Sequence, residues 1–441
     1  MVNVEEDVLQ PIRTPRGPSF YLIAGSLAAV FAWGIAAWIW QIKNGLAVTG
    51  LNRPVFWGVY ITNFVFFIGI SHAGTLISAI LRISQAEWRR SITRSAEVIT
   101  VMVLVFGVGN ILIDLGRPDR MMNVLKHPHF TSPLLWDVTS ISCYLTASTI
   151  YLYLPLIPDI ARLRDHGVKW HRFYRFLALG WQETPRQKRI LERCISIMAV
   201  AVIPIAVSVH TVVSYVFSMT IQPMWHSAIF GPYFVVGAIF SGIAALLIAM
   251  AIIRKVYHLE EYLKDIHFNY LGILLLVMTL LWFYFTFCEY LTVFYGSEPL
   301  EMAIFRSKVS GPYAFYFWTM VVCCFVIPFV ILANRKTRTV TGTVVASAAI
   351  TIGMWLERFT IVVPSLVNPR LPYARGTYLP SLTELAITAG CFAAFILLYM
   401  IFTKIFPIVS IWEIEEGRET SLQEVHERVK GYLPGMDEVS K

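Results

Sequence analysis

The 441-residue sequence contains 56% hydrophobic and only 15% charged residues, and its mean hydropathy is +0.62. Because a soluble globular domain carries about 25% charged residues, this composition excludes that class of protein. The net charge of +8 does not by itself indicate a nucleic-acid partner, and its distribution along the chain matters more. The apolar runs are long and continuous, which predicts membrane-spanning helices rather than β-strands.

Ten apolar segments are long enough to cross a bilayer, which needs roughly 20 residues per helix. The first follows a polar segment, residues 1–18, without an evident cleavable signal peptide, so we expect it to remain as an anchor. In chain order the predicted spans are 19–40, 55–81, 95–113, 134–156, 195–217, 228–252, 269–293, 312–332, 341–361 and 382–403.

Basic residues alternate between the two sides of this predicted topology. If both termini are cytoplasmic, the cytoplasmic segments hold 26 Lys and Arg and the outer loops hold 9. The positive-inside rule therefore predicts cytoplasmic termini. The longest inner loop, 157–194, is basic and aromatic, so we expect it to lie along the inner membrane surface.

Spans 2–5 and 6–9 resemble two copies of one four-helix unit. Each unit starts with a helix that enters from outside and closes with an arginine, Arg82 or Arg254. We therefore predict an all-α integral membrane protein with two four-helix bundles, at 55–217 and 218–361. The remaining parts are the N-terminal segment 1–18, the first helix and outer loop 19–54, the outer loop and last helix 362–403, and the polar tail 404–441.

Ionisable side chains inside membrane spans are costly, so each is a candidate functional residue. Most of them fall in the first bundle toward its outer end, and His72 lies deeper, about 20 Å along its helix at ~1.5 Å per residue. The second bundle adds one carboxylate in span 7 and an adjacent acid–base pair in span 9. The candidates are His72, Asp114, Asp137, His210, Glu289, Glu357 and Arg358.

Several candidates also have a purely structural interpretation. Asp114 and Arg117 can form an interfacial ion pair that ends a helix, and His210 can simply hydrogen-bond a neighbouring backbone group.

The acid–base pair in span 9 has its own structural alternatives. Adjacent residues point about 100° apart on a helix, so we expect Glu357 and Arg358 to pair with other helices rather than with each other. Arg358 and Glu289 can then be mutual structural partners.

The first-bundle candidates have the chemistry of a quinol site. A quinol loses two protons as it loses two electrons, so a His or carboxylate must accept a proton at each hydroxyl. Its ring binds by apolar and aromatic contact, and Trp57, Phe130, Trp136 and Tyr215 occur nearby in the predicted spans and loops. The alternative is that these aromatic residues form interfacial belts.

The sequence shows no evident ligand set for a bound redox cofactor. Only His72 and His210 lie clearly within spans, and we expect them at different depths, which disfavours a bis-His haem. The six cysteines form no CxxC pair and are interpreted as small core residues, and no metal or nucleotide motif is found. If the chain takes part in electron transfer, a partner must supply the metal centres.

Four segments resemble the polysulfide reductase membrane-subunit family, often called NrfD-like. They are GISHAGTLISAILR at 69–82, DLGRPDR at 114–120, SPLLWD at 132–137 and SVHTVVSYVF at 208–217. The ten spans and the long basic inner loop make the chain most similar to the ActC subunit of bacterial alternative complex III. The resemblance covers about residues 15–405.

This resemblance implies a multi-pass protein of the bacterial inner membrane that binds menaquinol or ubiquinol and holds no haem or iron–sulfur cluster. It implies three kinds of partner: a periplasmic iron–sulfur protein, multihaem cytochrome c subunits and a paralogous NrfD-like membrane protein. Carried over to this sequence, it implies catalytic roles for His72, Asp114 and Asp137, quinol binding by His72, Asp137, His210, Arg117 and Trp136, and a proton route through Glu289, Glu357 and Arg358.

We therefore expect the quinol-oxidising membrane subunit of a respiratory or photosynthetic electron-transfer complex, with no catalysis by the isolated chain. Three alternatives remain open. The same residues suit a quinone-coupled subunit of a polysulfide-type reductase. A secondary transporter would use kinks at Pro204 and Pro328, and a mere membrane anchor would tolerate replacement of the buried ionisable residues.

Overall fold

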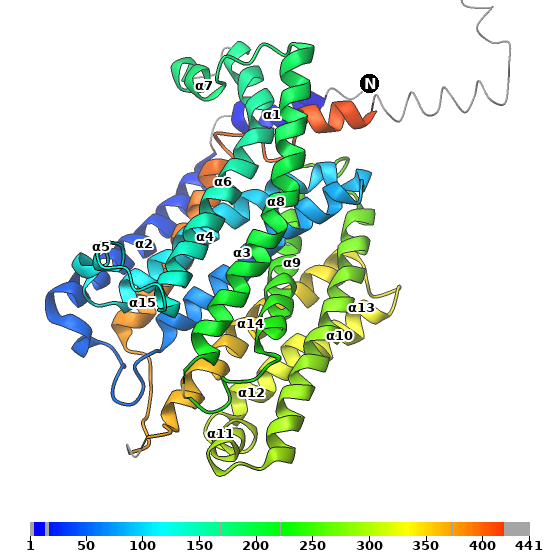
Figure 1. Ribbon diagram of the computed structural model, residues 1–441. Coiled ribbons are helices and arrows are strands. Elements are labelled where there is room, and N and C mark those ends of the chain that lie inside the picture. Colours follow the sequence, from blue (N-terminus) through cyan, green and yellow to red (C-terminus); the bar gives the residue numbers. More distant parts are fainter. Residues whose placement is uncertain (1–3, 14–16, 167–169, 221, 372–373, 419–441) are drawn as a thin grey trace, which may run out of the picture.

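The computed structural model describes residues 4–13, 17–166, 170–220, 222–371 and 374–418. Over these residues the regular structure is helical throughout, and ten helices are long and apolar enough to cross a membrane, which confirms the predicted fold class (Figure 1). The spanning helices are α2 (Pro18–Asn44), α3 (Val59–Ile83), α4 (Thr93–Asp114), α6 (Pro133–Asp165), α8 (Pro185–Ser218), α9 (Phe230–Val256), α10 (Asp265–Gly296), α12 (Ala314–Val321) with α13 (Ile327–Ala333), α14 (Val340–Val367) and α15 (Leu382–Phe402).

Four short α-helices lie before or between these spans. They are α1 (Val4–Arg13), α5 (Asn123–Lys126), α7 (His171–Leu177) and α11 (Pro299–Val309). The predicted inner loop 157–194 is mostly helical, because α6 continues to Asp165 and α8 starts at Pro185. Charged residues end the apolar run without ending the helix, so α6 reaches about 50 Å at ~1.5 Å per residue, well beyond a 30 Å hydrocarbon layer.

Helix α3 is the central element of the molecule. It packs against α4 and α8 on one side and against α9 and α14 on the other, so it joins the two predicted bundles. The approach to α4 is close, because a Cβ added at Gly74 would lie 1.9 Å from the carbonyl oxygen of Ala96. A glycine is therefore required at this contact.

Helices α2 and α15 form a separate pair at one edge of the molecule (Figure 1). They touch through Gly34 and Gly390, where a Cβ on either residue would come within 2.9 Å of the other's Cα. Small residues allow this backbone approach, as is common between membrane helices. Gln41 ties the pair to the first bundle by donating to the Ile113 carbonyl at 2.9 Å and accepting from the Tyr60 hydroxyl at 2.6 Å.

The eighth span is interrupted between its two α-helices. A π-helix, Val322–Val326, directly precedes Pro328, whose missing N–H disturbs the regular hydrogen-bond ladder. Pro204, by contrast, lies inside a continuous α8. Among the cysteines, Cys324 is buried beside Gly353, whereas Cys143 is exposed, so the prediction that all cysteines are core residues is wrong for Cys143.

Helix α1 and residues 403–418 lie at one end of the bundles, which we call the terminal face. Helices α5 and α11 and residues 368–371 and 374–381 lie at the other end, the loop face (Figure 1). A buried ion pair between Arg94 and Asp159 anchors the C-terminal segment here, because Asp159 also accepts from the backbone N–H groups of Ile411 and Trp412. The part of the predicted tail beyond residue 418 lies outside the described residues.

We expect Asp159→Ala to destabilise the protein strongly, because Arg94 is only 2% exposed and would lose its counter-charge. Breaking a buried ion pair on one side costs about 3–5 kcal/mol. The change is measured as the midpoint of thermal unfolding in detergent. The control Asp119→Asn breaks an ion pair on the exposed surface, with Arg117, and should leave the midpoint unchanged. Equal midpoints for Asp159→Ala and the wild type would contradict the anchoring role.

Candidate functional site

Two predicted site residues, His72 on α3 and His210 on α8, meet in the interior. Their ring centroids are 4.0 Å apart and both side chains are fully buried. The expectation that they lie at different depths is wrong, because their helices cross at this level. So close a contact leaves no space for a porphyrin between the two rings.

The two imidazoles have different hydrogen-bonding environments. His72 faces two backbone carbonyls, with Nδ1 2.9 Å from the Ile68 oxygen and Nε2 2.6 Å from the Ala206 oxygen. A neutral imidazole has one N–H and can donate to only one of them. Neither nitrogen of His210 has a hydrogen-bond partner among the described residues. His210 is therefore the ring with free capacity to bind or exchange a proton.

Aromatic rings surround the histidine pair. Tyr144 of α6 lies 5.1 Å from the His72 ring, and Phe234 of α9 lies 6.4 Å from the His210 ring. Toward the loop face, the Phe217 ring packs against the rings of Phe234 and Trp57, with centroid distances of 6.0 and 5.4 Å. These flat walls are suited to an aromatic ligand.

Arg358 of α14 lies on the second-bundle side of this cluster. Its guanidinium stands 4.8 Å above the Phe234 ring and 2.7 Å from a carboxylate oxygen of Glu357. The expectation that Glu357 and Arg358 pair only with other helices is therefore wrong, since their long side chains bend toward each other. The guanidinium occupies space left by Gly237, because a Cβ at that residue would lie 2.8 Å from it.

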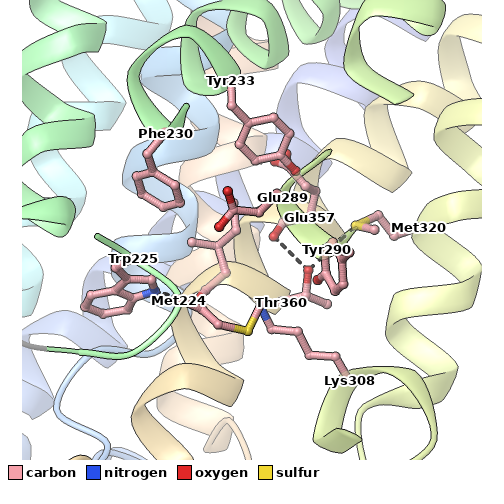
Figure 2. Close-up of a pocket in the computed structure, with 11 residues that line it drawn as sticks. Met224, Trp225, Phe230, Tyr233, Glu289, Tyr290, Lys308, Met320, Glu357 and Thr360 are labelled. Carbon is pink, nitrogen blue, oxygen red and sulfur yellow. Dashed lines mark hydrogen bonds between the residues drawn. The ribbon is translucent and has the colours of Figure 1, made fainter. Parts of the chain in front are cut away.

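A small polar cavity lies beyond Glu357 (Figure 2). Its volume is about 20 Å³, which is enough to hold one water molecule. Figure 2 shows Glu289, Glu357, Tyr233 and Tyr290 directed toward this space, with Lys308 entering from the loop face. Glu357 also accepts a hydrogen bond from Trp282 of α10 at 3.2 Å. In contrast, one oxygen of Glu289 has no hydrogen-bond partner among the described residues.

Lys308 is the residue of this cavity that sequence reasoning missed. It lies on α11, outside the predicted spans, although it is only 4% exposed. Burial lowers the pKa of Lys308 to about 8, and the negative charges of Glu289 and Glu357 oppose that shift. A lysine on a connecting helix can ordinarily reach water, so its sequence position gives no signal of burial.

The other predicted residues lie toward the loop face. Asp137 is 5% exposed and one of its oxygens lacks a partner among the described residues; the same holds for one oxygen of the partly buried Asp114. Arg117 points outward and pairs with Asp119 at 2.9 Å, so the alternative ion pair with Asp114 does not form. Trp136 is 40% exposed and donates to the Phe130 carbonyl. The structure thus brings neither Arg117 nor Trp136 to the histidine pair.

Comparison with known proteins places this site within a family. The family described as polysulphide reductase, NrfD, matches residues 47–369, well over half of the chain. The chain belongs to the NrfD family. The match includes the histidine pair, Glu289, Glu357 and Arg358 and excludes α15. The NrfD match therefore covers both bundles and the site between them.

Three relatives of known name are similar over nearly their whole length. A Halobacterium salinarum protein, provisionally named as the membrane component of a dimethyl sulfoxide reductase, is 24% identical, covering 87% of this chain and 90% of the relative. The integral membrane component of an Hdr-like menaquinol oxidoreductase from Archaeoglobus fulgidus is also 24% identical, and the similarity covers 90% of this chain and 95% of the relative. A protein of Mesobacillus selenatarsenatis named as one of the subunits of selenate reductase is 24% identical, and the similarity covers 89% of this chain and 96% of the relative.

The shifted pKa of Lys308 predicts a pH-dependent stability. Between pH 8 and 10.5 the unfolded chain holds a proton on this lysine that the folded protein has lost, so the free energy of unfolding should rise with pH across that window. Lys308→Met should remove this rise. Thermal unfolding at pH 7.5 and pH 10 measures it, with the exposed Lys188→Met as control. An unchanged pH slope in Lys308→Met would contradict the buried, partly deprotonated state.

Proposed function

We propose that this chain is the quinol-oxidising membrane subunit of an oxidoreductase complex and that the quinol head binds beside the histidine pair. The observation that carries the proposal is His210, a buried ring without a hydrogen-bond partner among the described residues, in contact with His72 and an aromatic wall. Membership of the NrfD family and the menaquinol oxidoreductase relative support a quinone, with menaquinol as the first candidate.

The dimensions of this region suit a quinol ring. On α6, Asp137 lies seven residues from Tyr144 toward the loop face; on α8, Phe217 lies seven residues from His210 in the same direction. Seven residues correspond to about 10 Å at ~1.5 Å per residue. The two oxygens of a quinol, with a hydrogen bond of about 2.8 Å at each, span roughly 11 Å. We propose that the quinol head lies between Asp137 and His210, beside Phe217.

Oxidation at such a site needs two proton acceptors. As the two O–H bonds break, one proton passes to His210 and the other to the Asp137 carboxylate, while the two electrons leave for a redox centre in another subunit. The close approach of the two His72 ring nitrogens to the Ile68 and Ala206 carbonyls fixes its ring, although only one of them can be donated to at a time, and that ring contacts His210. Asp114 belongs to the same proposal as a carboxylate on the loop-face side of the first bundle.

The identity of the partner proteins that accept the electrons is also proposed. Relatives named as dimethyl sulfoxide and selenate reductase subunits favour a terminal reductase as the electron acceptor. The second candidate is an alternative complex III type of assembly, with a periplasmic iron–sulfur protein, multihaem cytochrome c subunits and a paralogous membrane protein. It is favoured by the ten spans and the basic segment between α6 and α8. In both cases we propose a bacterial inner membrane location with cytoplasmic termini.

The cavity of the second bundle gives the proposal a separate proton route. Glu289 and Glu357 line the same cavity, Glu357 lies 2.7 Å from Arg358, and Glu289 lies within electrostatic reach of Lys308 and His226 at the loop face. We expect Glu289→Gln to leave quinol oxidation intact and to lower the number of protons moved per electron. The ratio is measured with the complex in liposomes. An unchanged ratio would remove Glu289 from the route.

The quinol site itself is tested by His210→Gln in the complete complex. Glutamine fills similar space but cannot exchange a proton, so turnover with a naphthoquinol should fall about 100-fold, within the range for loss of a general base. His267→Gln, at another buried histidine near the start of α10, is the matched control and should retain turnover. Bound quinone, extracted from the purified complex, should be present in both.

Two results would contradict the proposal. One is wild-type turnover in both His210→Gln and Asp137→Asn. The other is a purified complex that contains no quinone and does not oxidise quinol, which would favour the transporter or anchor interpretations.

A further inference from the structure

A set of exposed arginines at the terminal face has no counter-charge in the described part of the chain (Figure 1). They belong to α7 and to the first turns of α8: Arg172, Arg175, Arg186, Arg189 and Arg193. None of the five has a hydrogen-bond or ion-pair partner among the described residues. Several other basic side chains of this face are paired, as Arg162 is with Glu415 at 2.7 Å. The five arginines therefore carry positive charge that is open to an anionic ligand.

On α8 these arginines share a face with side chains that lie against lipid. Arg186, Arg189 and Arg193 follow one another at intervals of three and four residues, and Ile197 and Val200 continue the same row. The two apolar side chains are 60% and 61% exposed in the apolar part of a spanning helix, so in a bilayer lipid covers them. Arg193 lies about 10 Å beyond Val200 at ~1.5 Å per residue. The row thus passes from the hydrocarbon directly to positive charge at the height of the headgroups.

The opposite face of α8 carries charges of both signs. Lys188 lies on it and forms an ion pair with Glu183 at 3.0 Å, and Glu192 follows Lys188 one turn later. These three residues line a cleft of about 250 Å³ between the ends of α6 and α8 and the C-terminal segment. Glu183 and Glu192 are thus directed toward the cleft, away from the arginine row.

Helix α7 is held at the level where the spans end. The Tyr174 hydroxyl donates to the Ile405 carbonyl at 2.9 Å, just beyond the end of α15. The Tyr153 hydroxyl of α6 donates to the Leu177 carbonyl. Tyr153 lies 20 residues after Pro133, or about 30 Å along α6 at ~1.5 Å per residue, which is the thickness of the hydrocarbon layer. Both contacts therefore place α7 at the boundary between hydrocarbon and headgroups.

The outward side of α7 combines aromatic rings with positive charge. Phe176 is 77% exposed and Phe173 is 42% exposed. Arg172 and Arg175 each directly precede one of these rings. At a membrane boundary, apolar rings enter the acyl region while arginine side chains extend toward the phosphates. In water, by contrast, both rings would remain hydrated, which costs free energy. The composition of α7 thus fits a lipid surface.

We propose that α7 and the start of α8 bind the phosphate groups of anionic phospholipids in the leaflet at the terminal face. Guanidinium groups form paired hydrogen bonds to phosphate oxygens, and the five arginines lie at or just beyond the depth of those oxygens. Basic clusters beside a spanning helix favour lipids with a net negative charge, such as phosphatidylglycerol. The site is separate from the histidine pair and from the second-bundle cavity, so the inference does not depend on the proposed function.

The test is native mass spectrometry of the purified, delipidated complex in mild detergent, titrated with phosphatidylglycerol or phosphatidylcholine. The wild type should prefer phosphatidylglycerol, and the preference should shrink at high salt, which screens exposed charges. Arg189→Gln combined with Arg193→Gln should weaken phosphatidylglycerol binding about 30-fold, the combined effect of two basic residues at an anionic surface. Lysine at both positions keeps the charge and should retain most of the binding.

Two further double variants show whether the site is local. Arg172→Gln with Arg175→Gln should weaken binding like the α8 pair. The control, Arg335→Gln with Lys336→Gln, removes two exposed charges between α13 and α14 and should leave binding nearly unchanged. Unchanged midpoints of thermal unfolding in detergent establish that all variants fold.

Two outcomes would overturn the proposal. One is equal affinity of the wild type for the two lipids. The other is wild-type affinity for phosphatidylglycerol in both arginine double variants. If that second outcome is accompanied by loss of a partner protein from the complex, the arginines belong to a protein interface instead.

Discussion

The guanidinium of Arg358 lies between the two bundles, and the surrounding helices are shaped around it. Gly237 of α9 leaves room for it, Phe234 lies beneath it, and Glu357 supplies the counter-charge. A charge at this depth in lipid needs a partner and close packing. Helices α3, α9 and α14 therefore meet around this arginine and connect the two bundles. The polar residues of the first bundle and those of the second-bundle cavity come together here.

The two polar regions differ in chemistry. Toward the loop face the polar groups are carboxylates and a buried lysine around a water-sized cavity. Toward the terminal face they are mainly hydroxyls in direct contact. An arginine stays protonated at any accessible pH and repels protons in a narrow path. Its charge also acts on both histidines. Arg358 thus couples electrostatically to the histidine pair from the second-bundle side.

Hydropathy was sufficient to predict the ten spans, because hydrocarbon imposes one length and one kind of residue on each helix. It could not predict helix ends, and α6 continues through charged residues to Asp165. Side-chain pairing was harder still. The 100° between Glu357 and Arg358 describes their Cβ directions, yet long flexible side chains close that gap. Depth along each helix likewise said little about His72 and His210, since tilt and crossing decide which levels meet.

The buried ionisable residues that the sequence did not predict share one property. The burial of their charge, which costs free energy, arises only in the folded structure. Lys308 lies on a connecting helix and Glu97 near a span end, where either side chain could reach water in an isolated helix. Single serines and threonines are also common in membrane helices because they satisfy their own backbone. What distinguishes α3 is that its hydroxyls repeat on one face and meet a second stripe on α6. Once the fold brings these helices together, individually ordinary residues form hydrogen bonds between the helices at three levels, so the relevant signal belongs to the pair of helices and not to either sequence alone.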